Sequence, residues 1–163
     1  MTVAALPIGG LNIGCAPASR GFSATAEKLC NLFEEALSTR TSMALGGRYH
    51  ALAEAAGDAM EQNWDGYGAR SVDFAAVSRA TQLLRALPTT IPEPEIGVEP
   101  DGHVALDWYG GPGRAFTITI HGDGELKYAT LFGRDRTYGS AQFIEEIPDD
   151  VAYLLGKFLV RRA

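Results

Sequence analysis

The spacing of hydrophobic residues divides the chain into a first part that predicts helices and a second part that predicts strands. Up to residue 87, apolar residues recur three or four positions apart, which is the spacing of one face of a helix. From Glu95 to Ile144, apolar and polar residues alternate, which is typical of strands with one buried side. After Ile147 the helical spacing returns. The pattern therefore predicts an α+β fold.

Helices are expected over three stretches before the strands, at residues 23–37, 43–62 and 72–87. Ser71 is placed to cap the third, because a serine oxygen accepts a hydrogen bond from a free N–H group of the first helical turn. A closing helix is expected from Ile147 onwards. Pro148 suits its first position, and Asp149 and Asp150 suit the positive end of its dipole.

Four or five strands are expected in an antiparallel meander, at residues 96–99, 103–109, 115–121, 125–132 and 137–144. Short glycine-rich connections separate them, and such connections join antiparallel neighbours. Pairing Tyr109 with Ala115, and Ile120 with Leu126, keeps the apolar side chains on one face. The second pairing requires a three-residue turn in which Gly124 takes the left-handed conformation.

We divide the chain into an N-terminal arm (residues 1–21), a helical segment (22–62) and an α+β domain (63–163). The last two are expected to form one compact unit. The arm has apolar residues without charge, broken by glycine and proline. Such an arm can pack on its own domain, remain unstructured, or add a strand to a second copy. We favour a homodimer in which the arm takes part.

Charge and cysteine content exclude several classes of function. The net charge of −6 disfavours a general nucleic-acid binder, which needs a basic surface to neutralise phosphates. Cys15 and Cys30 are the only cysteines, which indicates no disulfide framework and a reducing cytoplasm. The sequence has no apolar run long enough to cross a bilayer and no pattern typical of a secretory signal, so we expect no membrane association.

Residues 62–70, with the sequence Gln-Asn-Trp-Asp-Gly-Tyr-Gly-Ala-Arg, are typical of a helix end followed by a structured loop. The two glycines can take positive φ, which the aromatic residues beside them cannot adopt cheaply. In one interpretation, Trp64 packs on the sheet while Asp65 binds backbone amides of the loop. In the other, the loop presents Asp65, Tyr67 and Arg70 to a partner.

The run Asn-Trp-Asp-Gly-Tyr-Gly-Ala at 63–69 resembles a motif of a family of small uncharacterised bacterial and phage proteins. That family pairs the motif with a Pro-Asp-Gly turn, a strand and an aromatic residue, as at residues 100–108. It also has a late Ile-Pro, as at Ile147 and Pro148. The similarity covers residues 62–159. No activity is established for the family, so the resemblance implies no catalytic residues.

The predicted register places His103, His121 and Glu125 together on the polar face of the sheet. Two imidazoles and a carboxylate could bind a metal or sense pH, and they could equally be part of a solvated sheet face. We favour the solvated face, and expect no metal or other cofactor. The sequence also lacks a phosphate-binding loop, a nucleophile-elbow serine and a Cys-x-x-Cys pair. We therefore expect a protein that is not an enzyme, with a metal-dependent hydrolase as the alternative.

Arg114, Arg134 and Arg136 are expected in hairpin connections at one end of the meander, because alternate turns share an end. Tyr109 and Tyr138 lie near the same turns, and tyrosine and arginine often anchor protein interfaces. We expect this group to bind a partner protein, alone or within a nucleoprotein complex. The sequence thus favours a non-catalytic interaction factor of a bacterium or phage, such as an inhibitor, immunity or accessory protein. A regulator of a nucleic-acid-processing system is a further alternative.

Overall fold

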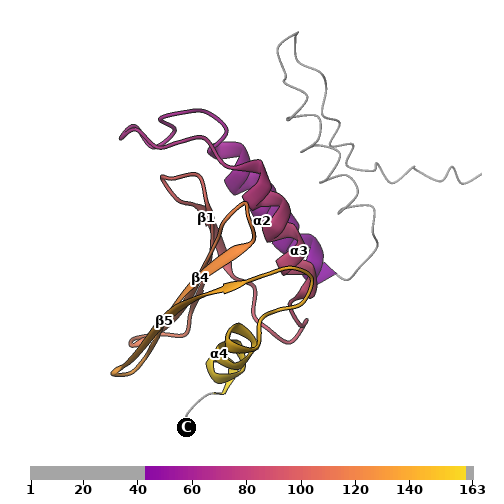
Figure 1. Ribbon diagram of the computed structural model, residues 1–163, viewed down its shortest axis with the longest axis vertical. Helices are drawn as coiled ribbons and strands as arrows, with labels where there is room; N and C mark the ends of the chain where they lie inside the picture. The colour runs from indigo at the N-terminus through magenta and orange to yellow at the C-terminus, as the bar shows by residue number, and fades with distance from the viewer. Residues whose placement is uncertain (1–42, 161–163) are drawn as a thin grey trace, which may run out of the picture.

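Helices cover one face of a five-stranded antiparallel sheet (Figure 1). The structure, a computed structural model, describes residues 43–160. Its elements are α2 (Met43–Asp58), α3 (Phe74–Ala86), β1 (Glu95–Val98), β2 (Val104–Tyr109), β3 (Arg114–Ile120), β4 (Glu125–Phe132), β5 (Asp135–Gln142) and α4 (Asp149–Leu159). The predicted α+β class is confirmed. The predicted arm at 1–21 and helix at 23–37 lie outside the described residues. Within 43–160, no helix is long and apolar enough to span a membrane.

The five strands lie side by side in chain order, as a meander. The predicted register is confirmed, because Tyr109 pairs with Ala115 and Ile120 pairs with Leu126. The turn between β3 and β4 has the predicted length, and Gly124 takes a φ of +91° there. This register places the apolar side chains of every central strand on the same face.

One hydrophobic core lies between the covered face of the sheet and the helices. The sheet contributes fully buried side chains from its three central strands: Val104, Leu106, Phe116, Ile118, Ile120 and Leu126. The helices contribute Leu52 from α2, Leu84 from α3 and Val151 from α4. Figure 1 shows all three helices on the same side of the sheet. Residues before and after position 63 therefore share a single core.

The connection between α2 and α3 differs from the sequence prediction at both ends. Helix α2 ends at Asp58, four residues before the predicted end at 62. The prediction that Ser71 caps α3 is wrong, because the cap is Asp73, whose carboxylate accepts the Ala75 N–H at 2.9 Å. The Val72 N–H donates to Ala59 and the Asp73 N–H donates to Gly102, each at 2.8 Å. These two bonds keep the chain extended up to the cap.

Strand β5 begins at Asp135, two residues before the predicted start. Phe132 pairs with Asp135, so Gly133 and Arg134 alone form the turn, and Gly133 takes a φ of +70°. Arg136 therefore lies within a strand and not in a hairpin connection, which corrects the sequence prediction. A two-residue turn suits an antiparallel hairpin because its twist matches that of the strands.

The proline-rich connector between α3 and β1 is held against the core by two side chains. The Trp108 indole N–H donates to the Pro92 carbonyl oxygen at 2.8 Å. Arg48 of α2 is buried, with 2% of its surface exposed, and donates through Nη2 to the Ile91 carbonyl oxygen at 2.5 Å. Ile91 itself is buried. The connector thus fixes where β1 starts relative to α2.

Candidate interaction surface

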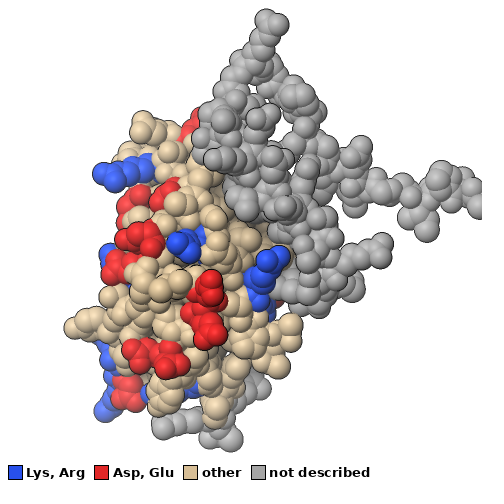
Figure 2. All heavy atoms as spheres, turned by 45° about the vertical axis from the view of Figure 1, so that its right-hand side comes forward, with Lys and Arg blue, Asp and Glu red and all other residues tan. Residues whose placement is uncertain are grey.

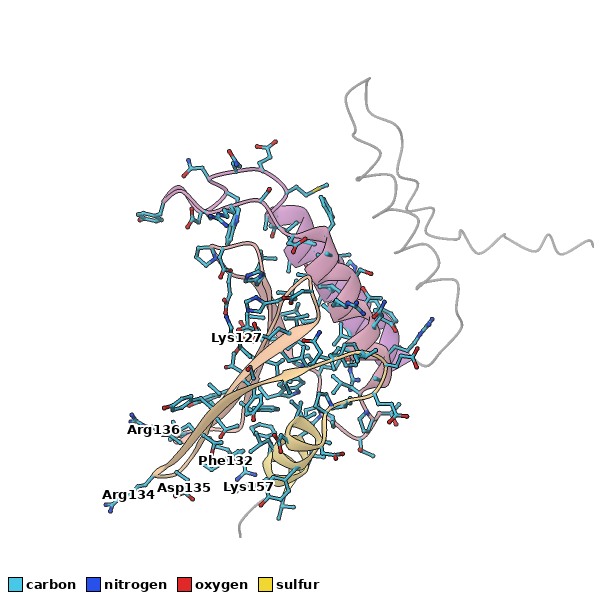
Figure 3. All side chains as sticks on the ribbon, in the orientation of Figure 1. Lys127, Phe132, Arg134, Asp135, Arg136 and Lys157 are labelled. Carbon is cyan, nitrogen blue, oxygen red and sulfur yellow. The ribbon has the colours of Figure 1, made fainter. Side chains whose placement is uncertain are left out.

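The β2–β3 and β4–β5 turns lie side by side at one end of the sheet, which we call the arginine end because Arg114, Arg134 and Arg136 lie there. The Gly133 N–H donates to the Gly113 carbonyl oxygen at 2.7 Å. This bond confirms the prediction that the two turns lie at the same end of the sheet. Arg134 and Arg136 are exposed. Figure 3 shows both side chains pointing away from the molecule at this end.

Arg114 has a different environment, because its side chain lies on the helical side of the sheet. Its Nη2 donates to three carbonyl oxygens at the end of α4, at 2.5 to 3.0 Å, those of Lys157, Phe158 and Val160. The guanidinium carbon also lies 5.5 Å from the centre of the Phe132 ring. A cation at the end of a helix stabilises the carbonyls that have no partner within the helix. Arg114 therefore joins α4 to the sheet, and is not a free arginine of the surface as the sequence interpretation assumed.

The face of the sheet that points away from the helices, here the open face, carries two exposed tyrosines near the arginine end. Tyr109 at the end of β2 is 75% exposed, and Tyr138 in β5 is 85% exposed. Arg136 lies on the same face, because it is two residues from Tyr138 in the same strand. Between these side chains the strands carry Ala115, Thr117, Ala129 and Leu131. Aromatic and cationic groups therefore border a patch of small and aliphatic side chains.

Acidic side chains predominate on one side of the open face, and both signs occur on the other. The β1–β2 side carries Glu95, Glu99 and Asp107. The β4–β5 side carries Lys127 and Arg136, together with Glu125. The hydroxyl of Thr119 donates to Glu99 at 3.0 Å. The hydroxyl of Thr117 donates to Asp107 at 2.5 Å. The threonines of the central strand thus hold the acidic side chains in place.

The structure brings His103 and His121 together, but as stacked rings. Their ring centroids are 3.8 Å apart and their planes are tilted by 32°. His103 Nε2 lies 3.7 Å from the Asp101 carboxylate, and Lys127 Nζ lies 3.9 Å from the Glu125 carboxylate. Within the described residues, no group of three or more His, Cys, Asp or Glu side chains is arranged to hold a metal ion. The stacking points ring faces at each other, whereas metal ligands use the nitrogen lone pairs in the ring plane.

The motif loop at 62–70 is held by hydrogen bonds to its own backbone. Asp65 accepts the Tyr67 N–H at 2.7 Å and the Ala69 N–H at 3.1 Å. These bonds lower the pKa of the Asp65 carboxyl below its ordinary value of 3.8. Asn63, at a φ of +61°, accepts the Gly68 N–H through its side chain at 2.7 Å. The predicted binding of loop amides by Asp65 is thus present in the structure.

Trp64 and Tyr67 of the motif loop lie in different environments. Trp64 is half-buried against the edge of the core, and its indole N–H donates to the Arg70 carbonyl oxygen at 3.0 Å. Tyr67 is 94% exposed at the tip of the loop. Arg70 is exposed, and its N–H donates to Pro100 in the β1–β2 turn at 2.8 Å. The loop therefore lies at the opposite end of the sheet from the arginine end.

Two surface features were not found from the sequence. Lys127 lies exposed on the open face opposite Thr119, and no motif in the sequence singles it out. A groove of about 550 Å³ lies between α3 and the segment after β5, lined by Arg79, Gln82, Arg85, Ala86, Phe143, Ile144 and Glu145. The helical spacing of Arg79, Gln82 and Arg85 predicts a shared face of α3. The segment that faces them is adjacent only in the folded chain, so the sequence carries no signal for the groove.

Comparisons with known proteins add no assignment. No protein-family model matches the chain, and neither a curated protein nor a solved structure matches it.

Proposed function

We propose that the protein is a non-catalytic interaction factor, whose partner protein binds the open face near the arginine end. The observation that supports this most is the group formed by Tyr109, Tyr138 and Arg136, which are exposed together on one face. Tyrosine and arginine supply much of the binding energy at protein interfaces, because they combine large contact area with specific polar groups. The resemblance of the motif loop suggests a bacterial or phage inhibitor, immunity or accessory protein acting in the cytoplasm.

The surface suits a partner that is acidic where it meets β4 and β5. Lys127 and Arg136 lie on that side of the open face beside the single carboxylate of Glu125, and Arg134 extends the cationic group at the turn. Opposite charges across an interface mainly raise the association rate and exclude wrong partners. A protein surface or a nucleoprotein complex with an acidic protein subunit would fit this arrangement.

The test is capture of partners from the source organism by the purified chain. We expect Arg136→Glu and Tyr138→Ala each to lose at least about tenfold in partner binding, which corresponds to roughly 1.4 kcal/mol. Arg85→Glu is the matched control, because Arg85 is exposed on α3, away from the open face, and its reversal changes the net charge equally. The proposal is wrong if captured proteins bind all three variants as they bind the unchanged chain.

A further inference from the structure

Within residues 43–160, no strand pairs with the outer edge of β5, whereas the opposite edge of the sheet is shielded. Strand β1 has four residues, follows Pro94 and contacts α2. Strand β5 has eight residues, and all of them are exposed or half-buried. It contains no proline or lysine, and its two charged residues, Asp135 and Arg136, both lie at its start, so the rest of the edge has none of the residues that commonly block edge pairing. An edge of this length is a template for another strand.

The hairpin geometry identifies which backbone groups of β5 point outwards. In a two-residue hairpin the residues beside the turn, here Phe132 and Asp135, exchange both hydrogen bonds. The bond from the Phe143 N–H to Gly124, at 2.9 Å, shows the same alternation at the far end of the strand. Odd-numbered residues of β5 therefore bond to β4. The N–H and C=O groups that point outwards belong to Arg136, Tyr138, Ser140 and Gln142.

We propose that β5 pairs with β5 of a second copy of this chain, antiparallel and about a twofold axis at Gly139, to form one continuous sheet. This register matches every outward residue with an outward residue: Arg136 with Gln142 and Tyr138 with Ser140 of the second copy. Each such pair can exchange two hydrogen bonds. A shift by two residues in either direction leaves outward groups at the strand ends without partners.

The charges at the two ends of β5 favour a second copy as the occupant. One end carries Arg134 and Arg136 with Asp135 between them, a net positive charge, and the other end is followed by Glu145 and Glu146. An antiparallel twofold pairing brings the basic end of each copy beside the acidic end of the other, twice. Gln142 pairs with Glu125 of β4, so Arg136 of the second copy reaches an acidic position across one strand. A parallel pairing, or a strand from an unrelated protein, would not place opposite charges beside each other in this way.

The position of the axis also suits the covered face. Gly139 has no side chain, and a Cβ there would lie 2.5 Å from the Tyr128 hydroxyl. The Tyr128 hydroxyl thus fills the space over Gly139, and in the proposed pair the two Tyr128 hydroxyls lie beside the axis. The inference is carried by the outward backbone groups of β5, so it does not rest on the proposed function.

The test is the mass of the full chain in solution, measured by sedimentation velocity over a wide range of protein concentration. We expect a species of twice the chain mass of 17.4 kDa. Ser140→Pro removes an outward N–H that pairs with no other strand within residues 43–160, and should raise the dissociation constant about tenfold or more. Ser140→Ala is the matched control and should remain dimeric. A monomer at all concentrations, or a dimer unchanged in Ser140→Pro, overturns the proposal.

Hydrogen exchange of the unchanged chain decides the question if Ser140→Pro fails to fold. We expect the amides of Arg136, Tyr138, Ser140 and Gln142 to become protected as protein concentration rises. The amide of Thr137, which points towards β4, should be protected at every concentration. A dimer in which the outward amides exchange freely places the contact elsewhere, for example at the N-terminal arm, and overturns the proposal.

Discussion

The two tryptophans lie at different depths, and this difference sets how much each contributes to stability. Trp108 is 2% exposed, stacks on Phe116 with ring centroids 5.5 Å apart, and binds the connector before β1. Trp64 is half-buried at the core edge and binds only within its own loop. The sequence suggests a core role for Trp64 because it lies between a helix end and glycines. That pattern does not distinguish a residue at the edge of the core from one inside it.

We expect Trp108→Ala to lower the free energy of unfolding by about 3–5 kcal/mol, as is usual for a buried aromatic residue. Trp64→Ala should cost less, roughly 1–2 kcal/mol, because part of its ring is in water in the folded state. Urea unfolding of both variants measures the difference. Equal losses would mean that Trp64 contributes as a full member of the core.

At the scale of elements, the attachment of α4 depends on Arg114. The helix packs Val151, Leu155 and Phe158 on the sheet, and Arg114 binds the carbonyls of its last turn. Two cations lie over the Phe132 ring: the Arg114 guanidinium, and Lys157 Nζ at 5.1 Å from the ring centre. Figure 3 shows Phe132 and Lys157 between the sheet and the helix. One arginine thus couples the β2–β3 turn, the end of β4 and the end of α4.

Arg114→Ala should lower the free energy of unfolding by about 2–3 kcal/mol, because several charge-assisted hydrogen bonds and a cation–π contact are lost. Arg114→Lys should recover only part of this loss, since an ammonium lacks the planar fork of a guanidinium. Arg134→Ala is the control and should change stability by less than about 0.5 kcal/mol, because Arg134 is exposed in a turn. Thermal unfolding followed by circular dichroism compares the three. A loss for Arg134→Ala as large as that for Arg114→Ala would contradict this division of roles.

The elements and register were predictable from the sequence because each strand has one apolar side and each turn has its own glycine signal. That pattern alone predicts that Val104, Phe116 and Leu126 lie on the same face of the sheet. What the sequence could not show is where long polar side chains reach. Arg114 is one residue from a glycine-rich turn, which suggests exposure, but its partners lie more than forty residues later. The sequence did not identify Asp73 as the cap of α3 for a similar reason. The start of α3 depends on the hydrogen bonds from the Val72 and Asp73 N–H groups to Ala59 and Gly102, which are distant or unmarked in the sequence.

At the scale of the whole molecule, the charges form small groups of both signs rather than one field. Figure 2 shows acidic side chains in several groups with basic side chains among them. On the face shown, the acidic side chains form no continuous row of the kind that would mimic a nucleic-acid backbone. The two ends of the sheet differ more clearly. The motif-loop end carries Asp65, Asp101 and Asp123 beside Arg70, and the arginine end carries Arg134 and Arg136 beside Asp135.

This distribution gives a test of the alternative in which the protein regulates a nucleic-acid-processing system by direct contact. Phosphate binding needs several free cations on one surface, and its affinity falls steeply as salt rises. Arg114 is bound to α4, so the arginine end offers two exposed arginines next to a face that carries Glu95, Glu99, Asp107 and Glu125. We expect short single-stranded and duplex DNA to bind more weakly than about 10⁻⁴ M at physiological salt, as measured by fluorescence anisotropy. Micromolar binding that weakens with salt and is lost in Arg134→Glu/Arg136→Glu, but kept in Arg85→Glu, would favour that alternative over a protein partner.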